Sequence, residues 1–157
     1  MSARDLKSTN GFLLSDFKYL MAYSIPLTAL IGFYLGGYWL FTTPFYIFVI
    51  IPIVEFLLTR YGIDELETHR AEKGIHWLFD LMLYLNILIV FGLLIYSLTK
   101  IVSFEFMSIE FLGSLLSLGL VLASNGINVA HELCHRTNTP ERILGKFLLI
   151  QSLYMHF

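Results

Sequence analysis

The sequence YLMAYSIPLTALIGFYLGGYWLFTTPFYIFVIIPIV, residues 19–54, contains no charged side chain over 36 consecutive positions. A membrane-spanning helix needs about 20 residues at ~1.5 Å each, so this stretch is long enough for two spans folded back as a hairpin. The residues Gly36-Gly37 and Thr42-Thr43-Pro44 disfavour a continuous helix, and they predict that the break falls there. The stretch therefore predicts a membrane protein whose chain crosses the bilayer more than once.

The overall composition agrees with a membrane protein and excludes several other classes. Of the 157 residues, 57% are hydrophobic and only 14% are charged, and the mean hydropathy is +0.72. Soluble domains carry roughly 25% charged residues. The net charge of −2 argues against a nucleic-acid-binding protein, which would show a basic excess. The single cysteine, Cys134, excludes a disulfide framework and a cysteine-rich metal site.

Two more apolar segments follow the hairpin, at residues 77–98 and 111–130. After them, Thr139 as an N-cap and Pro140 at the first helical position predict a new helix that runs toward Phe157. We therefore expect an all-α fold, a polytopic transmembrane helical bundle of about four spans plus the start of a further helix on the cytoplasmic side.

The basic residues predict the orientation of this bundle. Nine of them lie before the first span, between the second and third, or after the fourth, and one lies on the opposite side; the nine are Arg4, Lys7, Lys18, Arg60, Arg70, Lys73, Arg136, Arg142 and Lys146, and the one is Lys100. Positively charged loops are enriched on the cytoplasmic side of membrane proteins. The bias predicts a cytoplasmic N-terminus and a cytoplasmic position for residues 131–135.

The string His131-Glu132-Leu133-Cys134-His135 is the sharpest chemical signal in the chain. Residues four apart share one face of a helix, so both imidazoles are able to bind one metal ion. At about 100° per residue, six polar residues of this segment fall on one arc of roughly 120°; they are Ser124, Asn125, Asn128, His131, Glu132 and His135. A polar stripe on a membrane helix must face a protein interior, a cavity or an ion, although hydrogen bonding between helices is the simpler alternative.

The stretch from Asn128 to Arg136, together with the sequence Gln151-Ser152-Leu153-Tyr154-Met155-His156-Phe157, resembles the bacterial membrane alkane 1-monooxygenases. That family belongs with the xylene monooxygenases and the integral-membrane fatty acid desaturases, which hold two irons through several histidine boxes. Its first box has the sequence His-Glu-Leu-Gly-His-Lys, whereas this chain has Cys134 and Arg136 in place of the glycine and the lysine. Cys134 lies on the opposite arc of the helix, which favours packing over metal binding.

The resemblance implies a membrane non-haem di-iron monooxygenase that hydroxylates the terminal carbon of n-alkanes to 1-alkanols with O2 and electrons from a rubredoxin-type donor. It implies that His131 and His135 bind iron. Glu132, Asn128 and His156 are candidates to contact and orient those ligands, and the motif leaves open whether Glu132 is itself a ligand. No other catalytic residue is predicted. Residues 1–157 would be the N-terminal part of a single fatty-acid-desaturase-like hydroxylase domain whose C-terminal part is missing, and we expect this part alone to be inactive.

The same resemblance implies the surroundings and the partners of the protein. It places the chain in the bacterial inner (cytoplasmic) membrane, with lipid, n-alkane, O2 and the electron donor as partners. Aromatic residues are candidates for lining an alkane channel, although a lipid-facing or interfacial position is the favoured explanation for each of them; they are Phe33, Tyr34, Phe45, Tyr46, Phe48, Tyr84 and Phe91.

Other functions remain open on the sequence alone. Within the same superfamily, a fatty acid desaturase or a xylene-type hydroxylase is the nearest alternative. A membrane zinc protease would use the same His-Glu-x-x-His string with Glu132 as general base. A non-enzymatic membrane or transport subunit would use the polar stripe only for packing between helices.

Overall fold

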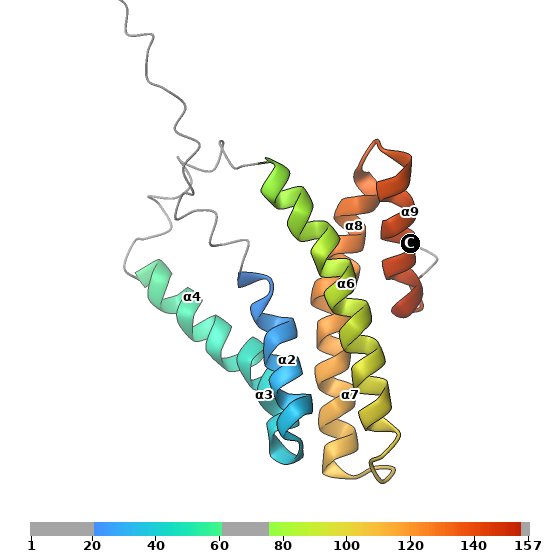
Figure 1. Ribbon diagram of the computed structural model, residues 1–157. Coiled ribbons are helices and arrows are strands. Elements are labelled where there is room, and N and C mark those ends of the chain that lie inside the picture. Colours follow the sequence, from blue (N-terminus) through green and yellow to red (C-terminus); the bar gives the residue numbers. More distant parts are fainter. Residues whose placement is uncertain (1–20, 61–75, 155–157) are drawn as a thin grey trace, which may run out of the picture.

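The computed structural model describes residues 21–60 and 76–154, with side chains from Phe79 onward in the second range. Every regular element in these ranges is helical, which confirms the predicted all-α fold. The elements in chain order are α2 (Ser24–Leu35), the 3-10 helix η2 (Gly37–Phe41), α3 (Thr42–Phe45), the π-helix η3 (Tyr46–Ile50), α4 (Ile51–Arg60), α6 (His76–Ile101), α7 (Ile109–Val121), the π-helix η5 (Leu122–Ile127), α8 (Asn128–His135) and α9 (Thr139–Gln151) (Figure 1).

Three of the described helical stretches are long and apolar enough to cross a bilayer, namely Gly37–Arg60, Phe79–Ile101 and Ile109–His135. The first of the four expected spans corresponds to α2, whose 12 helical residues are too few to cross the membrane by themselves. The predicted break is confirmed at Gly36-Gly37, but it does not extend to Thr42-Thr43-Pro44, which lies inside the continuous helical stretch Gly37–Arg60. Both glycines adopt positive φ angles, of 71° and 59°, which side chains rarely tolerate, and the helix ends there. The described residues thus give three spans and one shorter apolar helix.

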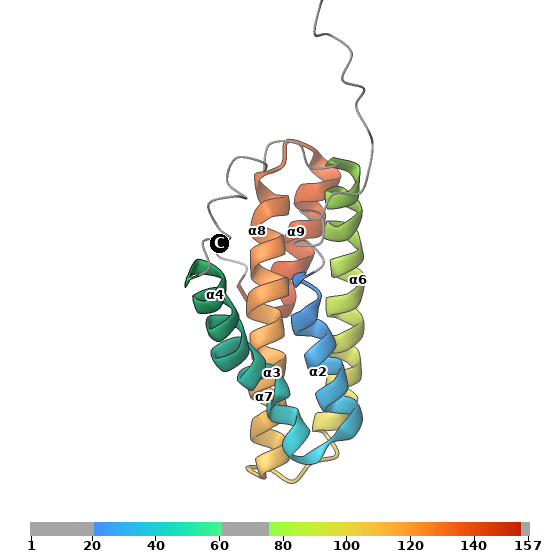
Figure 2. The same cartoon turned by 90° about the vertical axis from the view of Figure 1, so that its left-hand side faces the viewer.

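The helices form a bundle in which α6 runs away from the histidine end and α7 returns beside it (Figure 1). Helix α2 packs between them, whereas α4 leans away from the bundle in both perpendicular views and has no buried residue (Figure 2). Because an apolar helix of this kind is exposed on nearly all sides, its surface suits contact with lipid. The compact part of the fold consists of α2, α6, the Ile109–His135 helix and α9.

The predicted continuation of the fourth apolar segment into the histidine string is confirmed, since Ile109–His135 is one continuous helical stretch. Its upper end is held in place by a core of Leu83, Ile87 and Val90 from α6, Ala130 and Leu133 from α8, and Leu148 and Leu149 from α9. Burial of these aliphatic side chains fixes α8 against both neighbours. The core therefore determines which face of α8 remains accessible.

Helix α9 folds back along α8 after a short turn. It begins at Thr139 with Pro140 in its first turn, as predicted, but Asn138 rather than Thr139 is the N-cap, because Asn138 has the extended backbone that precedes a helix. A Cβ atom at Gly145 would lie 2.9 Å from the Ala130 carbonyl oxygen. Glycine at this position therefore allows the two helices to approach closely.

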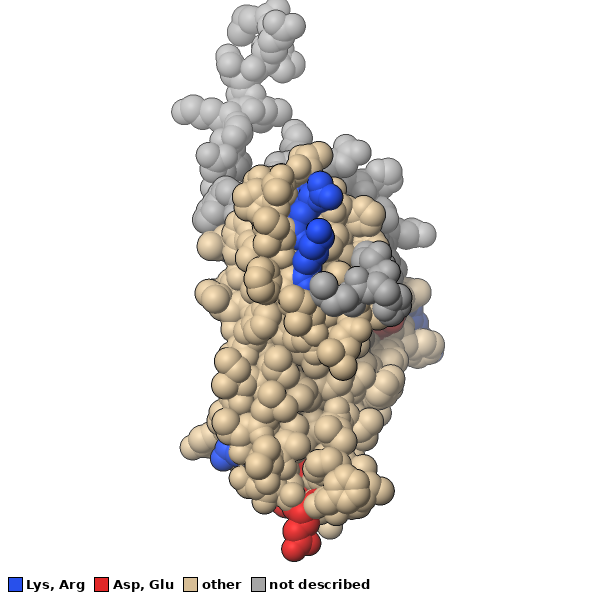
Figure 3. Space-filling model, turned by 90° about the vertical axis from the view of Figure 1, so that its right-hand side faces the viewer, with Lys and Arg blue, Asp and Glu red and all other residues tan. Residues whose placement is uncertain are grey.

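Charged residues separate toward the two ends of the bundle. On the face shown in Figure 3, basic side chains form a stripe over the upper part, where α9 lies, and acidic side chains gather at the lower end (Figure 3). Arg142 and Lys146 are exposed one turn apart on α9, and Lys100 lies at the far end of α6. The fold thus puts Lys100 at the opposite end from Arg136, Arg142 and Lys146, as the basic-residue count predicts.

Candidate metal centre

The imidazoles of His131 and His135 point the same way from α8. Their Nε2 atoms are 3.3 Å apart, and their ring centroids are 4.5 Å apart at an interplanar angle of 60°. Two nitrogens bound at about 2.1 Å to one ion at a tetrahedral angle would be separated by roughly 3.4 Å. The same distance also suits an imidazole–imidazole hydrogen bond when no ion is bound. The two donors therefore fit a shared metal ion without rearrangement of the helix.

The pair is exposed rather than enclosed. Both histidines, and Asn128 and Glu132 on the same helix, are exposed, and no group of three or more His, Cys, Asp or Glu side chains suited to one ion occurs in residues 21–60 or 76–154. His156, which we expected to assist the ligands, lies outside the described residues. The described part of the chain therefore brings together two nitrogen donors for a metal ion, those of His131 and His135.

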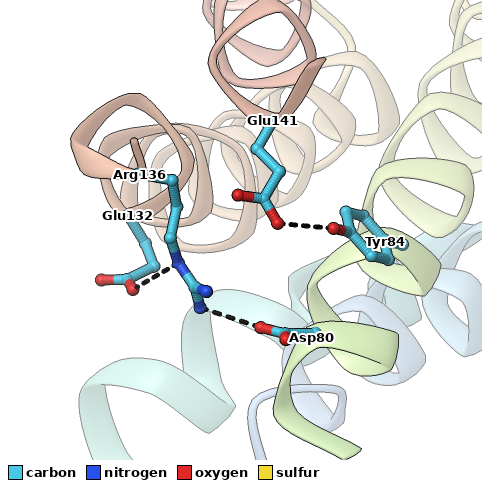
Figure 4. A network of polar contacts seen from close by, with 5 residues as sticks. All are labelled: Asp80, Tyr84, Glu132, Arg136 and Glu141. Carbon is cyan, nitrogen blue, oxygen red and sulfur yellow. Dashed lines mark hydrogen bonds and ion pairs between the residues drawn. The ribbon is translucent and has the colours of Figure 1, made fainter. Parts of the chain in front are cut away.

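Glu132 takes part in an ion-pair network that the sequence did not predict (Figure 4). Its carboxylate lies 3.4 Å from Nε of Arg136, and a terminal nitrogen of the same guanidinium lies 2.9 Å from the Asp80 carboxylate. Nearby, the Tyr84 hydroxyl donates a hydrogen bond of 2.6 Å to Glu141. The network joins the start of α6 to the end of α8 and the first turn of α9.

Arg136 stays protonated in this network. Desolvation lowers the pKa of its guanidinium, whereas the negative charge of Asp80 and the hydrogen bond to it raise that pKa, and the net direction is upward. Arg136 is therefore a permanent cation between two carboxylates. The Glu132 carboxylate is therefore directed toward Arg136. This ion pair competes with any contact between Glu132 and a metal ion or its histidine ligands.

The residues of the predicted polar stripe have different surroundings. Ser124, Asn125, Asn128 and Glu132 line one groove, which is described below. Asn125 is buried against α6 and the turn before α2, while Asn128, His131, Glu132 and His135 are exposed. Asn125 lies in the π-helical segment η5, whose i→i+5 hydrogen bonds widen the turn.

Asn125 and Asn86 form the hydrogen-bonded centre of the bundle. The Asn125 amide donates to the Asn86 amide oxygen at 2.9 Å and to the Ala22 carbonyl oxygen at 2.9 Å. In return, the Asn86 amide donates at 2.7 Å to the backbone carbonyl of Asn125, which lies within the π-helix. The pair thus joins η5 to α6 and to the turn before α2, and it satisfies a backbone carbonyl of the π-helical segment.

Cys134 faces α9 rather than the histidines. It is half-buried and packs against the core of α6, α8 and α9, and its sulfur would lie 2.9 Å from a Cβ atom placed on Gly145. This arrangement agrees with the expectation that Cys134 packs against its neighbours.

A groove of about 460 Å³ opens beside the histidine-bearing helix. Its walls come from the start of α2, from α6 and from the η5–α8 segment, and its lining residues are Ala22, Tyr23, Ile25, Phe79, Met82, Leu83, Asn86, Ser124, Asn125, Asn128, Val129 and Glu132. None of the seven aromatic residues proposed for a channel lines it. Phe33 lies in the core, and Tyr46 lines a smaller cavity of about 250 Å³ beside α4. The aromatic residues of this groove are Tyr23 and Phe79, which lack a distinguishing pattern in the sequence.

Comparison with known proteins places these features beside one enzyme. No known protein-family profile matches the chain. Over 124 residues, which is 77% of this chain, it is 30% identical to alkane 1-monooxygenase 1 of Pseudomonas aeruginosa. The chain spans about a third (32%) of the length of that relative. The chain, with its membrane-spanning helices and its paired histidines, is therefore a distant relative of an alkane 1-monooxygenase.

Proposed function

We propose that this chain supplies two histidine ligands, His131 and His135, to a non-haem di-iron centre of a membrane monooxygenase. The observation that carries the proposal is the 3.3 Å separation of the two Nε2 atoms on one face of α8. Imidazole nitrogen is a suitable ligand for iron. The distant relationship to an alkane 1-monooxygenase supports iron over other metals and hydroxylation over other reactions.

The proposed reaction is hydroxylation of the terminal carbon of an n-alkane to a 1-alkanol, with O2 and electrons from a rubredoxin-type donor. Bound iron supplies the activation of O2 that an unactivated C–H bond requires. In this proposal, other residues of the chain hold the helix that carries the two histidine ligands. The core under Leu133 fixes the position of α8, and Arg136 anchors its end to Asp80 of α6.

The ion pair between Glu132 and Arg136 favours this function over the zinc-protease alternative. In a protease with this string, the glutamate must accept a proton from metal-bound water. In this structure the Glu132 carboxylate is instead engaged by the Arg136 guanidinium. The arrangement is better suited to a residue that orients neighbouring groups than to a general base.

Metal retention tests the proposal. The chain is purified in lipid nanodiscs under anaerobic conditions, loaded with Fe²⁺, passed through a desalting column and analysed for iron and zinc. We expect the parent chain to retain more iron than His131→Ala or His135→Ala, each of which removes one of the two described nitrogen donors. Asn138→Ala, which changes an exposed residue in the turn after α8, is the matched control and should behave like the parent. Equal iron in all four proteins would refute the site.

Activity gives a separate measurement. Because the described residues bring only two nitrogen donors together, we expect residues 1–157 alone to form no 1-octanol from n-octane in the presence of O2 and a reduced rubredoxin. Formation of 1-octanol by this chain would contradict the proposal that further ligands are needed.

A further inference from the structure

Helix α9 has one buried face and one exposed face. Toward the bundle it buries Gly145, Leu148 and Leu149. Between Arg142 and Gln151 the exposed residues are Arg142, Ile143, Lys146, Phe147 and Ile150. At about 100° per residue these side chains span an arc of roughly 140°, with the basic residues along one edge and the apolar residues over the remainder. The exposed face of α9 therefore consists of a basic strip beside an apolar strip.

The packing of α9 against its neighbour determines the depth of this face in a membrane. The Ile109–His135 helix has 27 residues and is about 40 Å long, so it exceeds a hydrocarbon core of ~30 Å by about 10 Å. The exposed polar residues of α8 put this excess at the histidine end. Gly145 lies against Ala130 near that end, and Ser152, just after α9, lies beside Gly126, one turn deeper. A bilayer around this helix would have its headgroups at the start of α9 and its hydrocarbon at the end of α9.

The basic strip carries charge that the described residues do not neutralise. Arg142 and Lys146 make no ion pair within the described part of the chain, unlike Arg136. Glu141 is engaged by the Tyr84 hydroxyl on the side of α9 that faces α6. Figure 3 shows the basic stripe among uncharged described side chains. Residues four apart on a helix have Cβ atoms roughly 5–6 Å apart, so both basic side chains are able to reach one phosphate group.

We propose that the exposed face of α9 binds an anionic phospholipid of the surrounding bilayer, with the phosphate between Arg142 and Lys146 and the acyl chains along Phe147 and Ile150. The basic and apolar residues follow each other along α9 in the same order as the phosphate and acyl chains of such a lipid. Basic side chains near a membrane surface attract anionic lipids. A soluble acidic protein would suit the two charges, but it would not reach apolar side chains at the depth of the hydrocarbon.

A tryptophan on this face makes the local lipid composition measurable. The chain's two tryptophans are replaced by Trp39→Phe and Trp77→Phe, and Phe147→Trp then provides one fluorescent residue on the apolar strip. This reporter chain is reconstituted in phosphatidylcholine that contains a minor share of lipid with brominated acyl chains. Quenching by brominated phosphatidylglycerol is compared with quenching by brominated phosphatidylcholine. We expect the anionic lipid to quench more strongly, because it is enriched beside α9.

Substitutions in the basic strip test the headgroup contact in the same reporter chain. Arg142→Gln and Lys146→Gln should each lower the preference for phosphatidylglycerol about fivefold, as one basic residue near a lipid surface provides. Arg142→Lys keeps the charge and should keep the preference. Lys100→Gln removes the same charge at the far end of α6 and is the matched control, which should leave the preference unchanged. The helix content measured by circular dichroism confirms that each variant is folded.

Four outcomes would overturn the proposal. Equal quenching by the two brominated lipids would show no preference for an anionic headgroup, and quenching by neither would show that this face lies outside the bilayer. An equal loss of preference in Lys100→Gln would assign the effect to net charge alone. Weaker binding of a rubredoxin to Arg142→Gln and Lys146→Gln, with unchanged lipid preference, would assign the strip to an acidic protein. None of these measurements includes a metal ion, so their outcome is independent of the proposed metal site.

Discussion

Two pairs of polar residues on the Ile109–His135 helix and its neighbour α6 have opposite surroundings. Asn86 and Asn125 are buried, and their amides bond to each other and to the Ala22 carbonyl. His131 and His135, two turns farther along, are exposed, and their Nε2 atoms lie 3.3 Å apart. Polar groups buried in an apolar bundle are stable only when neighbouring residues satisfy them, whereas an accessible pair of nitrogen atoms is able to bind an external ion.

The π-helix η5 separates these two environments. Asn125 lies within η5 and bonds to α6, whereas His131 and His135 lie beyond η5 on an exposed part of α8. The comparison indicates that the asparagine pair stabilises the fold and that the histidine pair binds a ligand, and the two roles predict opposite responses to substitution.

The largest expected effect is loss of metal binding at the histidine pair without loss of stability. His131→Ala or His135→Ala removes one of two ligands on an exposed face, so Fe²⁺ affinity should fall by at least about a hundredfold. The free energy of unfolding should change by less than about 0.5 kcal/mol, as for other exposed positions. Iron titration and thermal unfolding in the same nanodisc preparation measure both quantities. A large loss of stability would mean that the histidines serve the fold.

The asparagine pair should show the reverse behaviour. Asn125→Ala leaves the Asn86 amide oxygen and the Ala22 carbonyl without their buried donor, so we expect destabilisation by about 1–2 kcal/mol, within the range for membrane bundles. Metal affinity should stay within about threefold of the parent, because the histidines lie beyond η5. Thermal unfolding in detergent and iron titration test this result. A stability equal to the parent would show that the hydrogen bonds of Asn125 contribute nothing to the bundle.

The membrane class and the main helices were predictable from the sequence, and the arrangement of the site was predictable only in part. The charge-free run of residues 19–54 and the glycine pair Gly36-Gly37 predict the hairpin through local preferences, and the spacing of His131 and His135 predicts their shared face. The hydrogen-bond partner of Asn125 was not predictable, because Asn86 lies 39 residues away and meets it only through the packing of α6. The Asp80–Arg136–Glu132 network likewise depends on how α6 and α8 pack.

A smaller effect is expected where ion pairs join the start of α6 to the end of α8. Arg136→Gln removes both pairs while keeping a side chain of similar length, and the side chains of Arg136 and Asp80 are partly exposed. Solvent screening limits the loss of stability to about 0.5–1 kcal/mol, and added salt should reduce the difference from the parent. Unfolding at low and high salt checks this. A difference that does not depend on salt would assign the effect to the packing of Arg136 on Phe79 instead.

The smallest effect is expected at Cys134, which lies in the histidine string but outside both pairs. Its thiol packs against α9, where a Cβ atom on Gly145 would come within 2.9 Å of the sulfur. Cys134→Ala keeps helix propensity and removes one buried atom, so the unfolding free energy should fall by no more than about 1 kcal/mol. Iron affinity should equal that of the parent, since the thiol faces away from the two imidazoles. A fall in iron affinity comparable to that of His135→Ala would make the thiol a ligand, and it would require α8 to rotate away from α9 when metal binds.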